Sequence, residues 1–280
     1  MNGNTLVLVL SLVAGVVGTG IGGIIGVLLK GKGNKIMGRV LSFAGGVMVG
    51  IATFEMLPEA VSKSQVAGFK PSGVLITVAA LIIGMLVIYG LNKAIDIVEN
   101  MRTTHIQLAE LHHETKILEA KEGNECLSQK ENKRSLLKAG IIMLIAIALH
   151  NFPEGMAIGA TGAAETSMGV VLAIIIAVHN IPEGMAISAP LASGGVGPWK
   201  TIGLTTLAGA ATVLGAVIGL AVGGIGAMAT GICLALAAGA MLYVTFCEIL
   251  PQATLMEEGR VPAVSMLIGI VSSMLFVYLF

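Results

Sequence analysis

The chain of 280 residues is 55% hydrophobic and only 11% charged, and its 16 basic and 16 acidic residues give a net charge of zero. A soluble domain carries about 25% charged residues, so this composition excludes an ordinary soluble protein. We therefore expect one all-α integral membrane domain over residues 1–280, with the lipid bilayer as its surroundings and no nucleic acid as a partner.

Eight apolar runs are long enough to cross a bilayer, for which about 20 helical residues suffice. In chain order they cover residues 4–29, 36–58, 71–95, 136–160, 166–190, 201–222, 228–250 and 261–279. The first run has no basic residue ahead of it, which favours a retained helix over a cleaved signal peptide. The three cysteines show no CxxC spacing, so neither a disulfide framework nor a thiolate zinc site is expected.

Lysines and arginines concentrate in alternate loops. The loops after the first, third, fifth and seventh runs hold fourteen of the 16, whereas the opposite loops hold only Lys63 and Lys70. Loops rich in lysine and arginine remain in the cytoplasm. The pattern predicts a multi-pass protein of the cell membrane with both termini outside the cytoplasm.

The one sizeable polar segment, about 97–135, separates the third run from the fourth. Leucines at helical spacing, among them Leu108 and Leu111, predict an amphipathic cytoplasmic helix that is followed by a looser stretch over 122–133. Three histidines of this segment fit either a weak metal site or a solvated helix face: His105, His112 and His113. We interpret the segment as a cytoplasmic linker and not as a second domain.

Two internal repeats organise the apolar runs. An eleven-residue phrase occurs at 150–160 and again at 179–189, and a second similarity links 44–60 with 237–253. The loop charges make each pair antiparallel in the membrane. This predicts a 3+2+3 arrangement, in which two inverted three-helix units flank a central pair, as in many transporters. The alternative is that helices rich in small residues have acquired similar short sequences independently.

The doubled phrase places ionisable residues where membrane helices rarely hold them, which by default indicates function. His150 and Glu154 are four residues apart, as are His179 and Glu183, so each pair projects from one helix face. Imidazole and carboxylate groups bind Zn²⁺ and related divalent ions. The two helices together are predicted to supply four metal ligands, against the alternative of purely structural hydrogen bonds between helices.

A proline lies inside each copy of the phrase. Pro153 and Pro182 cannot donate a hydrogen bond to the carbonyls of Leu149 and Val178. We therefore expect a kink and a free carbonyl beside each histidine. Irregular backbone at membrane depth is tolerated where it is buried in protein or lines a cavity.

Four further residues join the candidate metal site. Asn151 and Asn180 follow the histidines and either add oxygen ligands or bond a neighbouring helix. Met48 lies two turns before Glu55 on the same helix face, and its thioether is either a ligand or core filling. Glu55 either guards the metal route or faces interfacial water.

Two carboxylates close together in a poorly solvated site cannot both ionise without a cation between them. A divalent ion neutralises both, and it binds the deprotonated forms of its ligands. Metal uptake is therefore predicted to weaken as the external pH falls.

These motifs resemble the ZIP (Zrt/Irt-like) metal transporters, particularly the bacterial ZupT/GufA-like branch. The resemblance covers the eight runs, the polar segment after the third and both copies of the HNxPEG phrase. It implies selective movement of Zn²⁺, and often Fe²⁺, Mn²⁺ or Cd²⁺, into the cytoplasm by an elevator-type carrier that forms a homodimer. It also implies that the transport site uses His150, Asn151, Glu154, His179, Asn180 and Glu183, with Met48 close by and Glu55 further along the same wall.

The chain departs from the family pattern in the sixth run. Many relatives carry a Glu-Pro pair that contributes to a second metal position, whereas this chain has Thr212 in the stretch 211–215. The departure predicts one strong metal position and not a full binuclear centre.

Two other functions compete with transport. An intramembrane zinc metalloprotease would need a string such as HExxH, which is absent. A non-transporting metal sensor would keep its signalling after loss of His150 and Glu154. No P-loop occurs either, so we expect a transporter that is not an enzyme and that has no cofactor apart from the transported ion.

Overall fold

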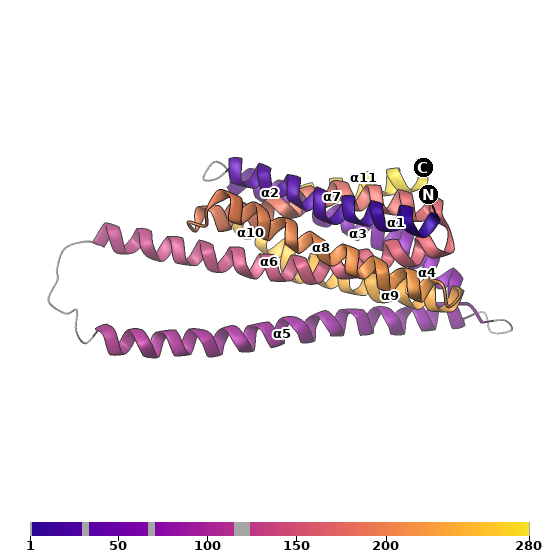
Figure 1. Cartoon of the computed structure of the whole chain (residues 1–280), viewed down its shortest axis with the longest axis horizontal. Coiled ribbons are helices and arrows are strands. Elements are labelled where there is room, and N and C mark those ends of the chain that lie inside the picture. The colour runs from indigo at the N-terminus through magenta and orange to yellow at the C-terminus, as the bar shows by residue number, and fades with distance from the viewer. Residues whose placement is uncertain (1, 30–33, 67–70, 115–123, 280) are drawn as a thin grey trace.

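The computed structural model describes residues 2–29, 34–66, 71–114 and 124–279, and each element in these ranges is a helix (Figure 1). Eight helical segments are long and apolar enough to cross a membrane, which confirms an all-α membrane protein with eight spans. In chain order they are Gly3–Leu28, Lys35–Lys63, Ser72–Ala94, Leu136–Ala164, Thr166–Ser193, Pro198–Gly223, Ala227–Met256 and Val261–Leu279.

Three of the spans are built from α-helices joined by a π-helical segment, denoted η. The first span is α1 (Gly3–Leu12), η1 (Val13–Gly18) and α2 (Thr19–Leu28), and the second is α3 (Asn34–Ile51), η2 (Ala52–Met56) and α4 (Leu57–Lys63). The seventh is α9 (Ala227–Val244), η3 (Thr245–Ile249) and α10 (Leu250–Met256). The third and fourth lie within α5 (Ser72–Glu114) and α6 (Asn124–Ala164), and the others are α7 (Thr166–Ser193), α8 (Pro198–Gly223) and α11 (Val261–Leu279).

The π-helical segments were not expected from the sequence, although proline explains two of them. Pro58 and Pro251 lie in the first turn of the α-helix that follows η2 or η3. The ring of a proline clashes with the carbonyl four residues earlier, and a π-bulge widens the helix at that point. Pro153 and Pro182, by contrast, lie inside helices that stay α-helical on both sides.

The polar segment between the third and fourth spans is more helical than predicted. Helix α5 runs on from its membrane span to Glu114, and α6 begins at Asn124, so the looser stretch predicted over 122–133 is wrong from residue 124 onward. Glutamate, lysine, glutamine and leucine are good helix formers, and their polarity indicates water and not the loss of helix. The backbone of α5 is described as far as Glu114, but the side chains that would form the predicted amphipathic face, with those of His105, His112 and His113, lie outside what the structure describes.

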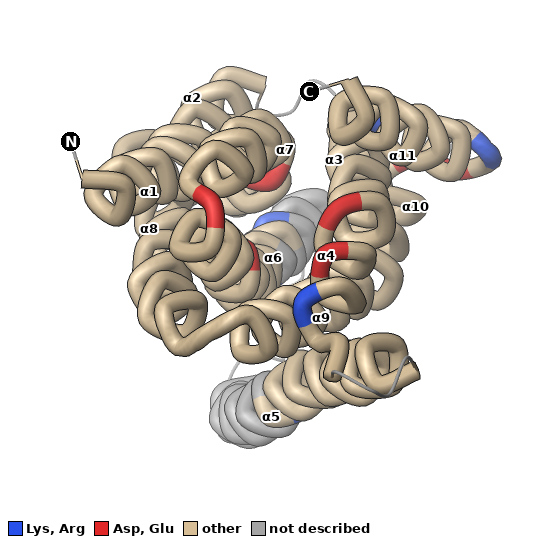
Figure 2. The backbone as a smooth tube through the Cα atoms, turned by 90° about the vertical axis from the view of Figure 1, so that its right-hand side faces the viewer, with Lys and Arg blue, Asp and Glu red and all other residues tan. Residues whose placement is uncertain are grey.

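The helices form two groups. Figure 2 shows α1, α2, α6, α7 and α8 together on one side and α3, α4, α5, α9, α10 and α11 on the other. Extensive contacts within the first group join α6 to α7 and α8, and α2 to α7, while α3 packs on α11 and α5 on α9 in the second. The groups meet where α6 contacts α9 and α3 contacts α7.

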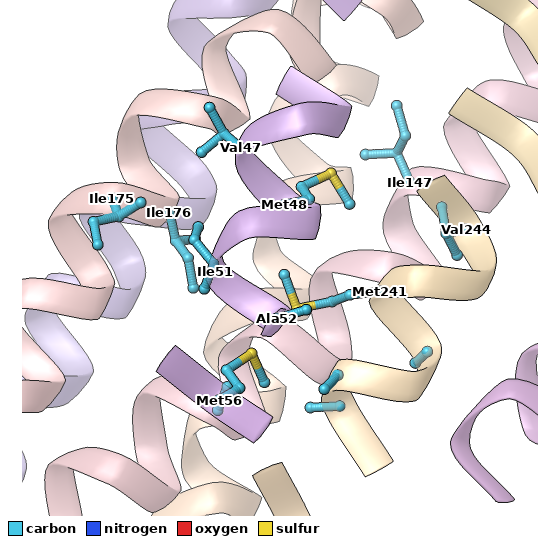
Figure 3. Close-up of a cluster of buried hydrophobic side chains, with 14 of the residues drawn as sticks. Val47, Met48, Ile51, Ala52, Met56, Ile147, Ile175, Ile176, Met241 and Val244 are labelled. Carbon is cyan, nitrogen blue, oxygen red and sulfur yellow. The ribbon is translucent and has the colours of Figure 1, made fainter. Parts of the chain in front are cut away.

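Buried apolar side chains fill the junction between the two groups. Figure 3 shows Met48 and Ile51 of α3 between the α7 side chain of Ile176 and the side chains of α6 and α9, among them Ile147 and Val244. All five are almost fully buried. This contact therefore depends on dispersion and close packing and not on polar bonds.

Glycines bring the backbones of the first group unusually close together. A Cβ atom at Gly159 of α6 would collide with the Ala216 carbonyl of α8, and one at Gly219 of α8 would collide with the Met156 carbonyl of α6. Small residues at such positions let membrane helices pack backbone to backbone. Helices α2 and α7 use the same device at Gly22.

Both chain termini lie at one end of the molecule, and the extensions of α5 and α6 project from the opposite end (Figure 1). An even number of spans requires this arrangement of the termini. The side of the membrane on which the termini lie, the single-domain boundary and the 3+2+3 inverted relation stay predictions.

Valine substitutions at two glycines of α8 test the close packing. Gly219→Val should destabilise the protein by at least about 1–3 kcal/mol, because overpacking must push α6 and α8 apart. Gly203→Val is the matched control, since nothing lies within 4 Å of a Cβ there, and both variants carry the same change in intrinsic helix propensity. Heating followed by size-exclusion chromatography in detergent should show a lower midpoint for Gly219→Val alone. Equal midpoints in the two variants would contradict the packing argument.

Candidate metal centre

The structure brings the two predicted His/Glu pairs into one cluster between α6 and α7. One ligand atom from each of His150, Glu154, His179 and Glu183 lies within 4.8 Å of the other three. All four side chains are almost fully buried. The cluster therefore combines the residue types predicted from the sequence at a spacing suited to one small ion.

Glu154 lies at the centre of the cluster. Its Oε1 atom is 2.8 Å from His150 Nε2 and 2.6 Å from His179 Nε2. The Oε1 atom of Glu183 is more distant, at 3.5 Å from His150 Nε2 and 3.9 Å from His179 Nε2. Glu154 thus contacts both imidazoles, one of them on its own helix and one on α7.

The glycine that follows each glutamate explains part of the repeated phrase. A Cβ atom at Gly155 would collide with the Thr212 carbonyl of α8, and one at Gly184 would collide with the Thr19 carbonyl of α2. Each half of the cluster is therefore pressed against a different helix directly beside its carboxylate. A glycine is the residue that permits both approaches.

The two asparagines are held by helices outside the α6–α7 pair. Asn151 Nδ2 donates to the Ala208 carbonyl of α8 at 3.2 Å, and Asn180 Nδ2 donates to the Ala14 carbonyl of η1 at 3.0 Å. The Oδ1 atom of each asparagine is buried and has no hydrogen-bond partner in the described structure. The amide nitrogens therefore bond neighbouring helices while the oxygens keep their capacity to accept. Sequence reasoning left both roles open and had no signal for the two carbonyls.

The cluster contains more buried acceptors and ring nitrogens than the described protein satisfies. Both oxygens of Glu183, Oε2 of Glu154 and Nδ1 of each histidine lack a hydrogen-bond partner. Buried polar groups are almost always paired, and an unpaired buried charge is costly. A cation bound between the two glutamates would satisfy their unpaired carboxylate oxygens.

The geometry fits a divalent ion. Zn²⁺ bonds to histidine nitrogen and carboxylate oxygen are about 2.0–2.2 Å long, which places the ligand atoms of a tetrahedron about 3.3 Å apart. The observed separations, from 2.6 Å for His179 and Glu154 to 4.8 Å at most, bracket that value. Small side-chain movements would therefore convert the cluster into a four-coordinate site.

Met48 lies in the apolar junction of the two helix groups. It is fully buried near Ile147 (Figure 3), and its Sδ atom accepts a hydrogen bond from Thr245 Oγ1 at 3.9 Å. Its packing matches the core-filling alternative, and its role as a thioether ligand stays a prediction.

Glu55 lines a separate cavity of about 330 Å³ near the end of the molecule that carries the termini. Glu59, Thr161 and Leu172 also line it. Thr161 follows Glu154 by seven residues, two helical turns, so the cavity lies along the direction of α6 from the cluster. Glu55 keeps one buried oxygen without a partner, whereas Glu59 pairs with Lys63 at 3.0 Å. Glu59 was not among the residues predicted from the sequence, although it directly follows Pro58, near the end of the same span as Glu55.

An apolar layer lies between the cavity and the cluster. Ile158 is one turn from Glu154 toward the cavity, and Ile176 is one turn from His179 in the same direction. Both are fully buried, as is Ile51 of α3, which lies beside Ile176 (Figure 3). A hydrated ion in the cavity is thus separated from the four ligands by close-packed isoleucines.

Thr212 lies in the stretch of the sixth span where many relatives are expected to carry a glutamate that contributes to a second metal position. Its side chain lies against Gly15 of η1, and its buried hydroxyl has no partner in the described structure. A neutral hydroxyl is a weaker ligand for a divalent ion than a carboxylate. This is consistent with one strong metal position, which stays a prediction.

Comparison with known proteins gives a coherent result. A family model described as ZIP Zinc transporter matches residues 5–277. A zinc transporter ZupT of Corynebacterium glutamicum is 36% identical over 247 residues, which cover 87% of each chain. The ZupT of Corynebacterium efficiens is 33% identical over 253 residues, covering 90% of this chain and 87% of that protein. The ZupT of Clostridium perfringens is 32% identical over 275 residues, covering 97% and 94%.

Glutamine substitutions separate a ligand role from a structural role. In the metal-free protein, Glu183→Gln should leave thermal stability unchanged or raise it, because the buried carboxylate has no hydrogen-bond partner in the described structure and lies 3.5 Å or more from both imidazoles. Glu154→Gln should lower it, because contacts to both imidazoles are weakened. Both variants should bind Zn²⁺ at least about tenfold more weakly in calorimetric titrations. A Glu183→Gln protein that is less stable without metal yet binds Zn²⁺ normally would contradict this assignment.

Proposed function

Because this chain belongs to the ZIP zinc transporter family, we propose that it carries Zn²⁺ across the cell membrane into the cytoplasm through the cluster on α6 and α7. Divalent metal transport is the activity of the family, and eight spans make the chain a multi-pass membrane protein. The observation that carries the residue assignment is the burial of two histidines and two glutamates with several unpaired acceptors. His150, Glu154, His179 and Glu183 are the proposed ligands.

The asparagines act beside these ligands in the proposal. Asn151 and Asn180 are fixed through their amide nitrogens, so their oxygens can complete the coordination of an ion without further ordering of the side chains. Met48 and Glu55 belong to the wall of α3 and η2. Glu55, in the cavity, is the proposed first contact of an entering ion.

Alternating access is proposed to occur at the junction of the two helix groups. The four ligands belong to a group whose helices contact one another backbone to backbone through glycines. The junction itself is apolar and lacks such interlocking carbonyl contacts at Met48 and Ile51. Movement of the first group as a unit along the second would carry the bound ion, together with Ile158 and Ile176 of the same helices, past Ile51 of α3.

The orientation and assembly are parts of the proposal. Both termini are placed outside the cytoplasm by the lysine and arginine distribution of the loops, and the protein is expected to work as a homodimer, as implied by its resemblance to the family. Fe²⁺, Mn²⁺ and Cd²⁺ are accepted by the same nitrogen and oxygen ligands. The relatives are named as transporters, and the metalloprotease and sensor alternatives find no support in the site.

Zinc uptake into proteoliposomes tests the central site. His179→Ala and Glu183→Ala should each reduce initial uptake by more than about tenfold, since each removes a ligand from a four-ligand site. Glu165→Gln is the control, because this exposed carboxylate bonds only to Ser167 in the described structure. A zinc-sensitive dye trapped inside the vesicles reports the rate. Unchanged uptake in both alanine variants would overturn the assignment.

The pH dependence of binding follows from the ligand set. Zn²⁺ needs neutral imidazole and ionised carboxylate, so protons compete with the ion and binding weakens as the pH falls. Between pH 7.5 and 5.5 the dissociation constant should rise by about tenfold or more. Titration of Zn²⁺ against the protein in liposomes at several pH values measures it. A constant affinity over that range would contradict ligation by the two histidines.

A further inference from the structure

A half-buried ion pair joins the second span to the end of the seventh, at the end of the molecule opposite the termini. Arg39 of α3 donates from Nε and Nη2 to both carboxylate oxygens of Glu257, over distances of 2.6–3.0 Å. The Glu257 side chain is 5% exposed, whereas that of Arg39 is 51% exposed. The hydrogen bonds from Arg39 lower the pKa of Glu257, which keeps the carboxylate ionised and the guanidinium fixed in orientation.

The fixed guanidinium has unused capacity. Arginine carries five N–H donors, and the bonds to Glu257 use one on Nε and one on Nη2, which leaves three without a partner among the described residues. Lys35 lies one turn earlier on the same face of α3 and is exposed, and exposed Arg260 directly precedes α11. Glu257 and exposed Glu258 are the acids nearby in sequence, so these three cations and two anions carry a net charge of +1.

A groove of about 240 Å³ opens beside Arg39 between α3 and α11. Val40, Phe43 and Ile268 give it an apolar lining, and Ser265 adds one hydroxyl. Beside Ile268 on α11, Leu267 and Val271 are apolar and 60% and 55% exposed. One end of the groove is thus cationic and the rest is apolar.

We propose that this groove binds one anionic glycerophospholipid, with its phosphate at Arg39 and Lys35 and its first acyl carbons against Val40, Phe43 and Ile268. Charge complementarity selects the anionic headgroup, since basic residues at the membrane surface attract anionic lipids. The apolar lining selects a lipid over free phosphate. The N-terminus of α11 adds the positive end of a helix dipole near the headgroup.

A lipid bound in the groove would stabilise the contact between α3 and its neighbouring helices. A lipid phosphate at Arg39 would connect α3 to α11 on the membrane side, while Glu257 connects α3 to the end of α10 on the buried side. Ligands that bind the folded protein raise its apparent stability by mass action. Anionic lipid should therefore stabilise the protein saturably, and the stabilisation measures occupancy of the groove.

The test is thermal stability of the full chain in detergent with added phosphatidylglycerol, phosphatidylcholine of the same acyl chains, or inorganic phosphate. Phosphatidylglycerol should raise the melting midpoint, and half of the rise should occur at a concentration about tenfold lower than for phosphatidylcholine. Lys35→Gln should shift the half-maximal phosphatidylglycerol concentration upward by about fivefold. Equal effects of the two lipids, or a full rise with inorganic phosphate alone, would overturn the proposal.

Tryptophan substitutions locate the site. Ile268→Trp fills the groove and should abolish the phosphatidylglycerol effect. Leu275→Trp, two turns further along the same outer face of α11 and 56% exposed, should keep it within about twofold. Both variants are first compared without lipid, so that a folding defect is separated from a binding defect. Loss of the effect in both variants, or its retention in Ile268→Trp, would place the lipid elsewhere and overturn the proposal. Arg39 itself is left intact, because its removal would strand the buried Glu257.

Discussion

Two imidazoles share one carboxylate oxygen at Glu154, and most of the first helix group is organised around that contact. Four ionisable side chains are buried there, and such a cluster is costly unless every member is held close to an opposite charge or to a cation. The asparagine bonds to η1 and α8 hold α6 and α7 from outside. Glycines beside each glutamate let α2 and α8 press against the pair. The repeated phrase thus encodes the ligands, their supports and the space for neighbouring backbones.

The contacts within the first helix group differ in kind from the contacts between the two groups. Within the first group, glycine contacts bring carbonyls of one helix against the backbone of another, so sliding between its helices would require many close contacts to break at once. Between the groups, methionine and isoleucine side chains meet across α3, α6, α7 and α9. Contacts of this kind can exchange one partner for another at similar energy. The contacts within the first group are therefore rigid, whereas the contacts between the two groups can rearrange.

Much of this could be predicted because membrane-spanning sequence obeys strict rules. The eight spans followed from hydropathy, and the clustering of four ionisable side chains followed from helical spacing, with His150 and Glu154 on one helix face and His179 and Glu183 on another. The π-helical segments could not be predicted, since Pro58 directly follows a π-helical segment whereas Pro182 lies inside an α-helix. The kink expected at Pro182 stays a prediction. The hydrogen bonds to the carbonyls of Ala14 and Ala208 could not be predicted from the sequence, because every residue has a backbone carbonyl. The helix beyond residue 124 was missed because polarity was interpreted as irregular structure.

A single residue, Glu165, connects α6 to α7. The two halves of the cluster are therefore joined at one end, about 15 Å from Glu154 along α6, by a connection that keeps the helices together there. In the proposed alternating-access movement this hairpin carries the ion as a unit. The side chains of α3 and α9 that face the hairpin would then control when the ion is released. Residues that never touch the metal would then set the turnover rate of the carrier.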